Sequence, residues 1–351
     1  MALLLRSSWL HPLNDRAAWS QLLSYFNPLW SLTEARARVL EVIDETPQVR
    51  SFWLRPNAQF GGFKAGQNVM VGVEINGSRH YRSYSFSSAP RADGAFRVTV
   101  QRQPGGRVSA ALHQVKVGDW VHLGDAQGRF APRTETSPVL MVAAGSGITP
   151  MLGLLDEMAQ MQPQRDVVLL HCVRDAIDEI AHAELTARCA AMPHLKYLLH
   201  RSSEHGRLPP AALGELAPDW RNRDALLCGP PSFARAIERF FELHDAQDQL
   251  QTEHFGRAPL MVDEHADSQS VSLLSSVQTF TAAAGQSLLE AAEASGLSPL
   301  YGCRRGICKT CQCQKRSGVV RNLATGELSG PGTEWIQLCV SSALTPIEIS
   351  L

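Results

Sequence analysis

The stretch Tyr-Gly-Cys-Arg-Arg-Gly-Ile-Cys-Lys-Thr-Cys occupies residues 301–311, and Gln-Leu-Cys follows at residues 337–339. Cys303, Cys308 and Cys311 are therefore separated by four and then two residues, and Cys339 follows after a long gap. This is the spacing that plant-type proteins use to hold a two-iron, two-sulfur cluster. Three thiolates on one short loop can surround a small cluster, and the fourth closes the coordination. The pattern predicts one-electron chemistry in the C-terminal part of the chain.

The main alternative for this cysteine set is a structural zinc ion, because four thiolates also suit tetrahedral zinc. Visible absorption distinguishes the two, since an iron-sulfur protein is coloured and zinc is silent. Of the other cysteines, Cys172 and Cys189 lie in apolar runs and are interpreted as packing residues. Cys313 is ambiguous, although Cys339 fits the position of a distant ligand better.

Composition excludes several classes of protein. The chain has 351 residues, enough for two or three domains, and a net charge of −1 that gives no argument for nucleic-acid binding. Eight cysteines, four of them spaced as ligands, favour a reducing compartment over a disulfide scaffold. The N-terminus lacks the pattern of a secretory signal, and no apolar run reaches the ~18 residues of a membrane span. We expect a cytoplasmic protein, with peripheral membrane contact left open.

The pattern of apolar, polar and turn-forming residues divides the chain into five predicted segments. Residues 1–35 form an aromatic-rich, partly helical extension that either packs against the main body or serves as a docking surface for a membrane or a partner. Short β-runs with a hairpin signal at Asn76-Gly77 predict an antiparallel barrel over residues 36–135. Buried apolar runs alternating with helices predict a doubly wound parallel α/β domain over residues 136–255. A polar linker over 256–270 precedes a cysteine-containing domain over 271–351.

Two short runs in the barrel segment have the chemistry that a flavin requires. In Arg82-Ser83-Tyr84-Ser85, the arginine can pair with a phosphate, the tyrosine can stack on a flat ring, and Ser85 can hydrogen-bond near the reactive nitrogen. Backbone amides of Gly106-Arg107-Val108-Ser109, at the start of a predicted helix, suit the rest of a pyrophosphate. An Arg-x-Tyr-Ser run is weak evidence by itself, because such residues alternate on any half-buried strand.

Two glycine-containing turns follow strands of the α/β segment. The first, Gly145-Ser-Gly147-Ile-Thr149-Pro150, allows a backbone to approach a dinucleotide phosphate at a helix N-terminus. The second, Cys228-Gly229-Pro230-Pro, ends a later strand. Ligands of open α/β sheets bind beyond the C-terminal ends of the strands, so the two turns together predict a nucleotide site.

The motifs in this order, followed by the cysteine spacing, resemble the ferredoxin-NADP reductase superfamily fused to a C-terminal ferredoxin, over about residues 36–351. The resemblance implies that the flavin is FAD, that the last domain is a β-grasp ferredoxin, and that Cys228 lies beside the nicotinamide. It also implies that Glu253-His-Phe255 brings a carboxylate and an aromatic ring near the flavin. The residues expected to take part in catalysis are Ser85, Cys228 and Glu253.

The nicotinamide cofactor is expected to be NADPH, with NADH as the alternative. Arg201 stands where NADP-dependent relatives place an arginine on the 2′-phosphate, and Arg207 is expected to assist. A guanidinium recognises a phosphate strongly. The alternative interpretation is that the two arginines are simply solvated loop residues.

A basic stretch surrounds the cysteine loop. It holds six cations and no acidic residue between positions 303 and 321: Arg304, Arg305, Lys309, Lys315, Arg316 and Arg321. These residues are either a solvated face or a rim that steers an acidic electron acceptor toward the cluster.

The expected function is a reductase that takes hydride from NADPH and passes single electrons through FAD and the cluster to a separate terminal enzyme. The cofactors supply the chemistry, and the protein supplies position and electrostatics. The aromatic extension resembles that of reductases serving membrane acyl-CoA or fatty-acid desaturases. Alternatives are the NADH-dependent reductase of a soluble aromatic-ring oxygenase or hydroxylase and, in another class, a zinc-stabilised redox-sensing binding protein.

Overall fold

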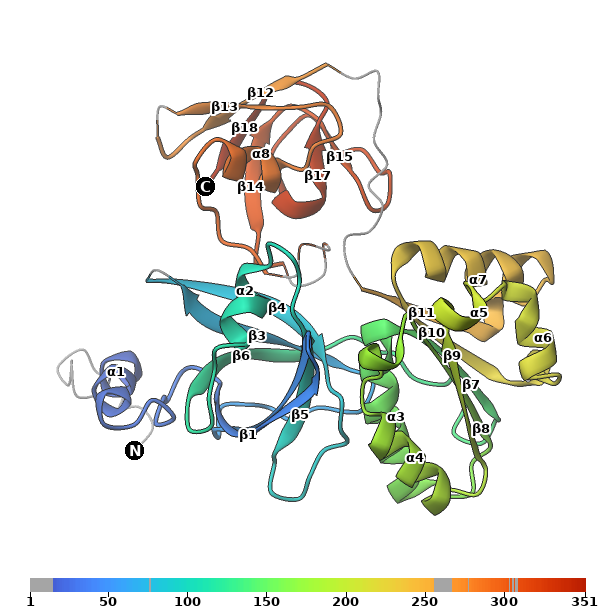
Figure 1. The fold of residues 1–351 in the computed structure, drawn as a ribbon. Coiled ribbons are helices and arrows are strands. Elements are labelled where there is room, and N and C mark those ends of the chain that lie inside the picture. The colour runs from blue at the N-terminus through green and yellow to red at the C-terminus, as the bar shows by residue number, and fades with distance from the viewer. Residues whose placement is uncertain are drawn as a thin grey trace. The chain divides into compact units, whose positions relative to one another are not determined.

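The computed structural model describes residues 15–75, 77–255, 267–276, 278–302, 304, 306 and 309–351. The chain folds into two compact units (Figure 1). The first comprises residues 1–79 and 83–255, and the second comprises residues 80–82 and 256–351. The predicted linker, residues 256–270, lies mostly outside the described residues, and its last two positions already belong to a strand.

The first part of unit one is an antiparallel barrel. Its elements are β1 (Arg36–Thr46), β2 (Val49–Pro56), β3 (Asn68–Ile75), β4 (Ser78–Ser85), β5 (Phe96–Gln101), α2 (Arg107–Leu112) and β6 (Trp120–Gln127). The strand order is β4-β3-β6-β1-β2-β5. A bridge between Phe86, just after β4, and Val98 of β5 joins the two edges. This bridge brings the two edges together around an apolar core that includes Phe52, Phe86 and Phe96.

The rest of unit one is a parallel sheet in the order β11-β10-β7-β8-β9. Its elements are β7 (Val139–Ala144), α3 (Ile148–Met161), β8 (Val167–Val173), α4 (His182–Ala191), β9 (Leu195–Arg201), α5 (Ser202–His205), α6 (Leu213–Leu216), β10 (Asp224–Gly229), α7 (Pro231–Leu243) and β11 (Leu250–His254). Helices α3 and α4 cover one face of the sheet, and α6 and α7 cover the other (Figure 1). Strands buried on both faces explain the continuous apolar runs in the sequence.

Polar contacts fix the barrel against the parallel sheet within unit one. The Arg97 guanidinium of β5 donates two hydrogen bonds to the Glu184 carboxylate of α4, at 2.6 and 3.2 Å. Asp156 of α3 accepts from the backbone N–H of Ala89 at 2.9 Å. Gly153 of α3 lies so close to the barrel that a Cβ there would stand 2.5 Å from the Phe86 carbonyl oxygen. The two halves of this unit therefore share one interface with little room for substitution.

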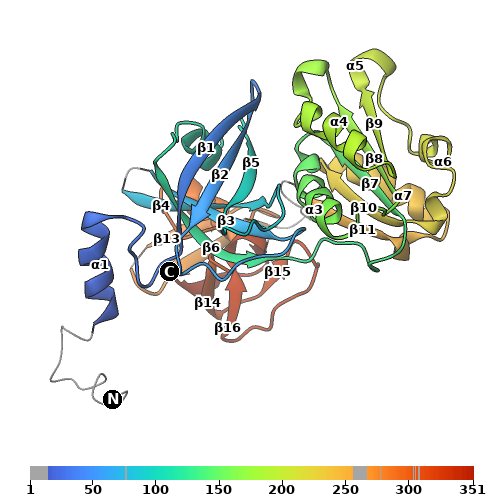
Figure 2. The ribbon, with the colours of Figure 1, turned by 90° about the horizontal axis from the view of Figure 1, so that it is seen from below.

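The predicted N-terminal helix is α1 (Arg16–Phe26), which lies beside the barrel (Figure 2). Its polar side faces the body: the Ser20 hydroxyl is 3.0 Å from that of Ser31, and Arg36 of β1 donates to the Ser24 hydroxyl at 3.3 Å. Its large apolar side chains are exposed, with Tyr25 at 88% and Phe26 at 77%. A surface helix normally turns its apolar face toward the core and its polar face toward solvent, and α1 does the opposite. Within the described residues, no helix is long and apolar enough to cross a bilayer.

Unit two is a mixed sheet that wraps one helix. Its elements are β12 (Gln269–Leu273), β13 (Thr279–Ala282), α8 (Leu288–Ala294), β14 (Gln312–Ser317), β15 (Val320–Asn322), β16 (Glu334–Gln337), β17 (Ser341–Ala343) and β18 (Ile347–Ser350). The main sheet has the order β13-β12-β18-β14-β16, with β12 and β18 parallel. Ser287 caps α8 as an acceptor for the Glu290 N–H, and Gly296 ends it with φ of +81°. The structure confirms the predicted fold class, which consists of an antiparallel barrel, a parallel α/β domain and a C-terminal domain of the iron-sulfur type.

Lys315 of β14 is a fully buried cation at 0% exposure. Its ammonium group donates to the carbonyl oxygens of Gly318, Gly330 and Gly332 at 2.8, 2.9 and 2.6 Å. Three carbonyls match the three donors of an ammonium group. Lys315 therefore joins the turn after β14 to the long loop before β16, and it is not part of the predicted basic rim.

Replacing Lys315 with Met should lower the stability of unit two by about 3 kcal/mol, because a side chain of similar length remains while three carbonyl oxygens lose a charged donor. Urea unfolding of the wild type and the variant measures the difference. Lys309→Met, at an exposed position of the same unit, is the control. Equal midpoints for K315M and wild type would contradict this role of the ammonium group.

His122 of β6 lies in a charged cluster that ties the segment before β1 to the barrel. Arg79 and Arg36 pair with Glu34 at 2.6 and 2.7 Å, and His122 Nδ1 lies 3.9 Å from the same carboxylate. Burial, reinforced by the two arginines, lowers the pKa of His122 from 6.5 to about 4. The imidazole is therefore neutral in the folded protein near neutral pH.

Stability should fall as the pH drops from 6.5 toward 4. Over this window His122 binds a proton in the unfolded chain and not in the folded one. Protonation therefore stabilises the unfolded state relative to the folded state. Thermal unfolding at closely spaced pH values measures the slope. We expect His122→Gln to have a shallower slope than wild type over this window, and identical slopes would show that His122 does not contribute.

Candidate functional site

The C-terminal ends of β4 and β11 meet at the junction of the barrel and the parallel sheet. The Ser85 hydroxyl donates to the Glu253 carboxylate at 3.3 Å, across 168 positions of sequence. Phe255, just after β11, packs against the buried cluster of α3 and its sheet face. Three residues chosen from two separate motifs therefore lie in one neighbourhood. Ser85 and Glu253 together offer a hydroxyl and a carboxylate that can hold or transfer a proton at this edge of the sheet.

The remaining residues of the barrel motif lie on β4. Ser83 donates its hydroxyl proton to the Asn68 side-chain oxygen of β3 at 2.7 Å, so this side chain braces the strand. Tyr84 is half-buried and packs against the barrel core. Arg82 is also half-buried, and its guanidinium donates to the backbone carbonyl of Tyr81 at 2.9 Å.

The predicted phosphate loop lines a cavity of about 380 Å³ together with Gln48, Arg102 and Gln103. Gly106 is needed there, because a Cβ would stand 2.6 Å from the Ser109 hydroxyl and 2.9 Å from Gln103 Cβ. The Ser109 hydroxyl accepts from the Gln103 N–H at 3.1 Å and donates to the Gly106 carbonyl at 3.2 Å, which closes the loop on itself. Arg102 and Arg107 give the cavity wall two cations, which fits the pyrophosphate of FAD.

The structure limits what Val108 and Ser109 can contribute. Val108 is 1% exposed in the barrel core and the Ser109 side chain is used by the loop, so only their backbone groups remain for a ligand. Arg102 was missed by motif reading, because it lies on the barrel side of the loop, outside the Gly-Gly-Arg run. Its position directly after a strand was the available signal.

The two nucleotide turns of the parallel sheet touch each other. A Cβ on Gly147 would stand 2.1 Å from the Cys228 carbonyl oxygen, so the first turn can lie against β10 only with glycine at this position. Gly145 adopts φ of +54°, a conformation that glycine accepts readily. Gly229 is similarly enclosed, with Phe233 and Ala144 at 3.0 and 3.1 Å from its added Cβ.

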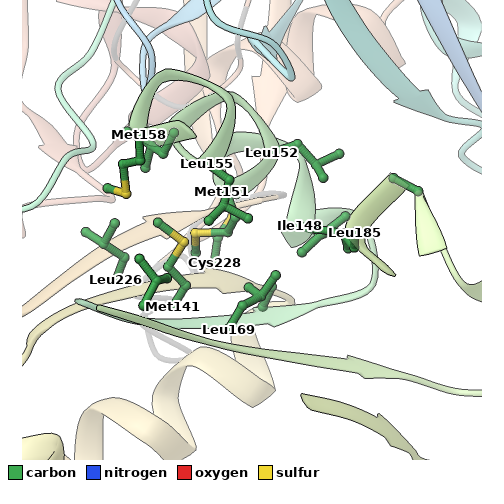
Figure 3. Close-up of a cluster of buried hydrophobic side chains, with 14 of the residues drawn as sticks. Met141, Ile148, Met151, Leu152, Leu155, Met158, Leu169, Leu185, Leu226 and Cys228 are labelled. Atoms are coloured by element: carbon green, nitrogen blue, oxygen red, sulfur yellow. The ribbon is translucent and has the colours of Figure 1, made fainter. Parts of the chain in front are cut away.

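The Cys228 side chain lies in the apolar core, where Figure 3 shows it among Met141, Met151 and Leu226. Its exposure is 0%. Thr149 and Pro150 are buried in the first turn of α3, whereas Pro230 is exposed at the end of β10. The two turns therefore present mainly backbone to a dinucleotide, as a close approach of phosphate to backbone requires.

His171 of β8 supports the first nucleotide turn and was not found from the sequence. Its Nε2 lies 3.2 Å from the Gly145 carbonyl oxygen, and its Nδ1 lies 3.5 Å from the Tyr197 hydroxyl. Burial lowers the pKa of His171 to about 4, so the ring is neutral and can donate to the carbonyl. The only sequence signal for His171 was that it is a polar residue within an otherwise apolar strand. The strand as a whole has the sequence pattern of a buried core element.

The predicted pair Arg201 and Arg207 lies at and beyond the end of β9. Arg201 forms ion pairs with Glu179 at 2.6 Å and with Glu204 at 3.4 Å. Arg207 is exposed in the loop after α5. Both arginines are at the C-terminal edge of the sheet, on the same side as the two nucleotide turns.

The last two cysteines of the ligand set are brought together in unit two. The Leu338 N–H donates to the Cys311 carbonyl at 3.1 Å, which places the residue before Cys339 directly against the cysteine loop. Cys311 and Cys339 are 3% and 6% exposed in one apolar cluster. Cys303 and Cys308 lie outside the described residues. A pair of buried thiols supplied from a loop and a distant segment fits the donor set of an iron-sulfur cluster.

Two further features of this loop are described by the structure. Cys313, which the sequence left ambiguous, is buried, and burial with the nearby Cys311 raises its pKa to about 12. The basic rim is smaller than predicted. Besides Lys315, Arg304 is engaged by an ion pair with Glu293 and lies over the Tyr301 ring at 4.0 Å. Arg305 is outside the described residues, so Lys309, Arg316 and Arg321 remain, of which Lys309 and Arg316 are exposed.

Three family models match the chain in the order that the fold presents. They are an oxidoreductase FAD-binding domain at residues 37–131, an oxidoreductase NAD-binding domain at 141–239 and a 2Fe-2S iron-sulfur cluster binding domain at 272–343. The last match favours the iron-sulfur cluster over zinc for the cysteine set.

Curated relatives align over nearly the whole chain. An NADPH oxidoreductase of Mycobacterium tuberculosis is 35% identical over 90% of this chain and 84% of its own length. The glycine betaine monooxygenase reductase subunit of Chromohalobacter salexigens is 29% identical over 93% of this chain and 99% of its own length. The solved structure of phthalate dioxygenase reductase, described as a modular structure for electron transfer from pyridine nucleotides to [2Fe-2S], matches with a TM-score of 0.64. It is 22% identical and covers 90% of this chain and 97% of its own.

The order of the three modules and the convergence of the Cys311 and Cys339 segments agree with these matches. FAD, a nicotinamide dinucleotide and a 2Fe-2S cluster are the cofactors of this architecture, and the chain is an oxidoreductase. It belongs, with the NADPH oxidoreductase of Mycobacterium tuberculosis, to the family of oxidoreductases that join an FAD-binding domain, an NAD-binding domain and a C-terminal 2Fe-2S domain.

Proposed function

We propose that this chain is an NADPH-dependent reductase that delivers electrons one at a time to a separate oxygen-activating enzyme. The observation that supports it best is the meeting of barrel and parallel sheet at Ser85 and Glu253, which brings the flavin module and the nucleotide module to one edge. When bound, FAD and the cluster convert a hydride, which carries two electrons, into single-electron steps. The protein residues bind and orient these groups.

We assign the residue roles as follows. Arg82, Arg107 and the backbone of the 106–109 loop would hold the anionic part of FAD, and Tyr84 would cover its ring. Ser85 and Glu253 form a polar pair that holds a proton near the reacting atoms. The turns at Gly145–Pro150 and Cys228–Pro230 receive the dinucleotide backbone, with Phe255 beside them. Cys303, Cys308, Cys311 and Cys339 ligate the cluster.

Arg201 supports NADPH as the electron donor, with Arg207 assisting. Arg201 ends β9 at the edge of the sheet where the nucleotide turns lie, and its side chain is 32% exposed. A guanidinium at that place can recognise a 2′-phosphate, which NADH lacks.

Purified protein should show flavin and iron-sulfur absorption, and anaerobic NADPH should bleach both in that order. Arg201→Ala should raise KM for NADPH by tenfold or more, about the effect of losing a charged hydrogen bond, while KM for NADH changes little. Arg239→Ala, an exposed arginine of α7, is the matched control. Equal changes in KM for the two cofactors would sink the assignment of Arg201.

The terminal acceptor is a separate protein. Relatives named as reductase subunits of monooxygenases favour an oxygenase-type partner, and a soluble oxygenase is the second candidate for that reason. We propose a membrane acyl-CoA or fatty-acid desaturase as the first candidate. The support is α1, which exposes Leu22, Tyr25 and Phe26 while its serines hold it to the barrel. Exposed aromatic and leucine side chains on one helix suit the interface of a membrane.

Changing Tyr25 and Phe26 together to Gln should reduce electron delivery to a desaturase in membranes several-fold without changing ferricyanide reduction by NADPH. The loss is expected because the apolar side chains no longer hold the reductase at the lipid surface. Unsaturated product in reconstituted vesicles is the readout. Met161→Gln with Leu243→Gln removes two apolar side chains that are 75% and 66% exposed elsewhere, and serves as the control. Wild-type product formation by the α1 variant would refute the membrane assignment.

A further inference from the structure

Arg201 lies between two carboxylates that differ sharply in burial. Its Nε donates to Glu179 Oε1 at 2.6 Å, and its Nη1 donates to Glu204 Oε1 at 3.4 Å. The Glu179 side chain is 8% exposed and the Glu204 side chain is 50% exposed. One carboxylate is thus built into the protein, and the other reaches the same guanidinium from the surface.

Glu179 is held on both sides. It lies between β8 and α4, where its second oxygen is 3.1 Å from His182 Nδ1. The Glu179 N–H donates to the Ala176 carbonyl at 3.3 Å, which fixes the backbone of this connection. A short, largely buried, charge-assisted hydrogen bond to Nε sets the plane of the guanidinium. Because Nε is used, Nη1 is directed toward the other carboxylate.

Glu204 has none of this support from burial. It belongs to the four-residue helix α5, three positions after Arg201, and its other oxygen lies 3.7 Å from the exposed His205 ring. An exposed pair at 3.4 Å contributes little stability and can be exchanged for another anion. Glu204 therefore places a displaceable negative charge where an incoming anion would meet Nη1.

We infer that Glu204 is a competing anion for Arg201 and that Glu179 is the positioning residue for the same guanidinium. The inference rests on the proposed role of Arg201 in binding the 2′-phosphate. Binding of NADPH displaces Glu204 from Nη1, and the two negative groups then repel each other. NADH has a hydroxyl in place of the phosphate, so it does not compete with Glu204. Glu204 thereby weakens the preference for the phosphorylated cofactor, and Glu179 strengthens it.

The two carboxylates should have opposite effects on binding of 2′,5′-ADP to the holoenzyme, measured by calorimetry. Glu204→Gln should tighten 2′,5′-ADP by about two- to fivefold, the scale of one exposed ion pair, and leave 5′-AMP unchanged. Glu179→Gln should weaken 2′,5′-ADP by about tenfold, because the guanidinium loses its charged anchor. A thermal unfolding midpoint equal to that of the wild type reports that each variant is folded.

Glu242→Gln is the matched control, because Glu242 forms an exposed pair with Arg239 at 3.2 Å with the same three-residue spacing. Tighter 2′,5′-ADP binding in E204Q but not in E242Q supports the inference. If Arg201→Ala abolishes the preference for 2′,5′-ADP over 5′-AMP while E204Q behaves like E242Q, the inference alone is overturned. If Arg201→Ala leaves that preference intact, the proposed 2′-phosphate site and the inference both fall. Tighter 2′,5′-ADP binding in E179Q would overturn the positioning role of Glu179.

Discussion

The ion pair of buried Arg97 with partly exposed Glu184 is the contact on which the working geometry of unit one depends. Arg97 is 6% exposed, and it also donates to the Ser87 carbonyl at 3.0 and 2.7 Å from two of its nitrogens. One side chain thus joins the barrel closure after β4 to helix α4 of the parallel sheet. Because charged partners in a buried site are costly to separate, this contact resists sliding of one module over the other. The meeting of Ser85 with Glu253 is a consequence of that fixed interface.

Close backbone approach is the second constraint, and it acts at this interface through Gly153 and within the parallel-sheet domain through Gly147. Gly153 and Gly147 each occupy a place where a Cβ would meet a carbonyl oxygen, of Phe86 in one case and Cys228 in the other. Two backbones in contact leave no adjustable side chain between them. Hydride transfer requires reacting atoms to be held at near contact, and a rigid, glycine-mediated junction supplies such precision better than a compliant one.

Sequence reasoning found the modules because their signals are local. Continuous apolar runs marked the parallel strands, and short β-runs separated by turns marked the antiparallel barrel. It named Ser85 from the chemistry of its motif and Glu253 from a family resemblance, but it did not predict their contact, which spans 168 positions. What it missed depends on tertiary surroundings. His171 looked like any core position, and its role comes from a carbonyl 26 residues away.

The basic rim was partly wrong for a related reason. Charge in a sequence does not reveal exposure, and Lys315 and Arg304 find partners only after folding. Counting cations along a stretch therefore overstated the positive surface. For Val108 and Ser109 only backbone groups were predicted to bind, and burial of Val108 and the loop contact of the Ser109 hydroxyl leave those backbone groups as the ones available.

The carbonyl cage around Lys315 makes this residue an internal reporter of motion. An amine that donates to three backbone oxygens at 0% exposure cannot meet an amine-reactive reagent or an acetyl donor. Labelling must wait until the loop before β16 opens, so its rate measures the local opening equilibrium of that loop. Chemical labelling of Lys315 would therefore report local opening of unit two without an attached probe.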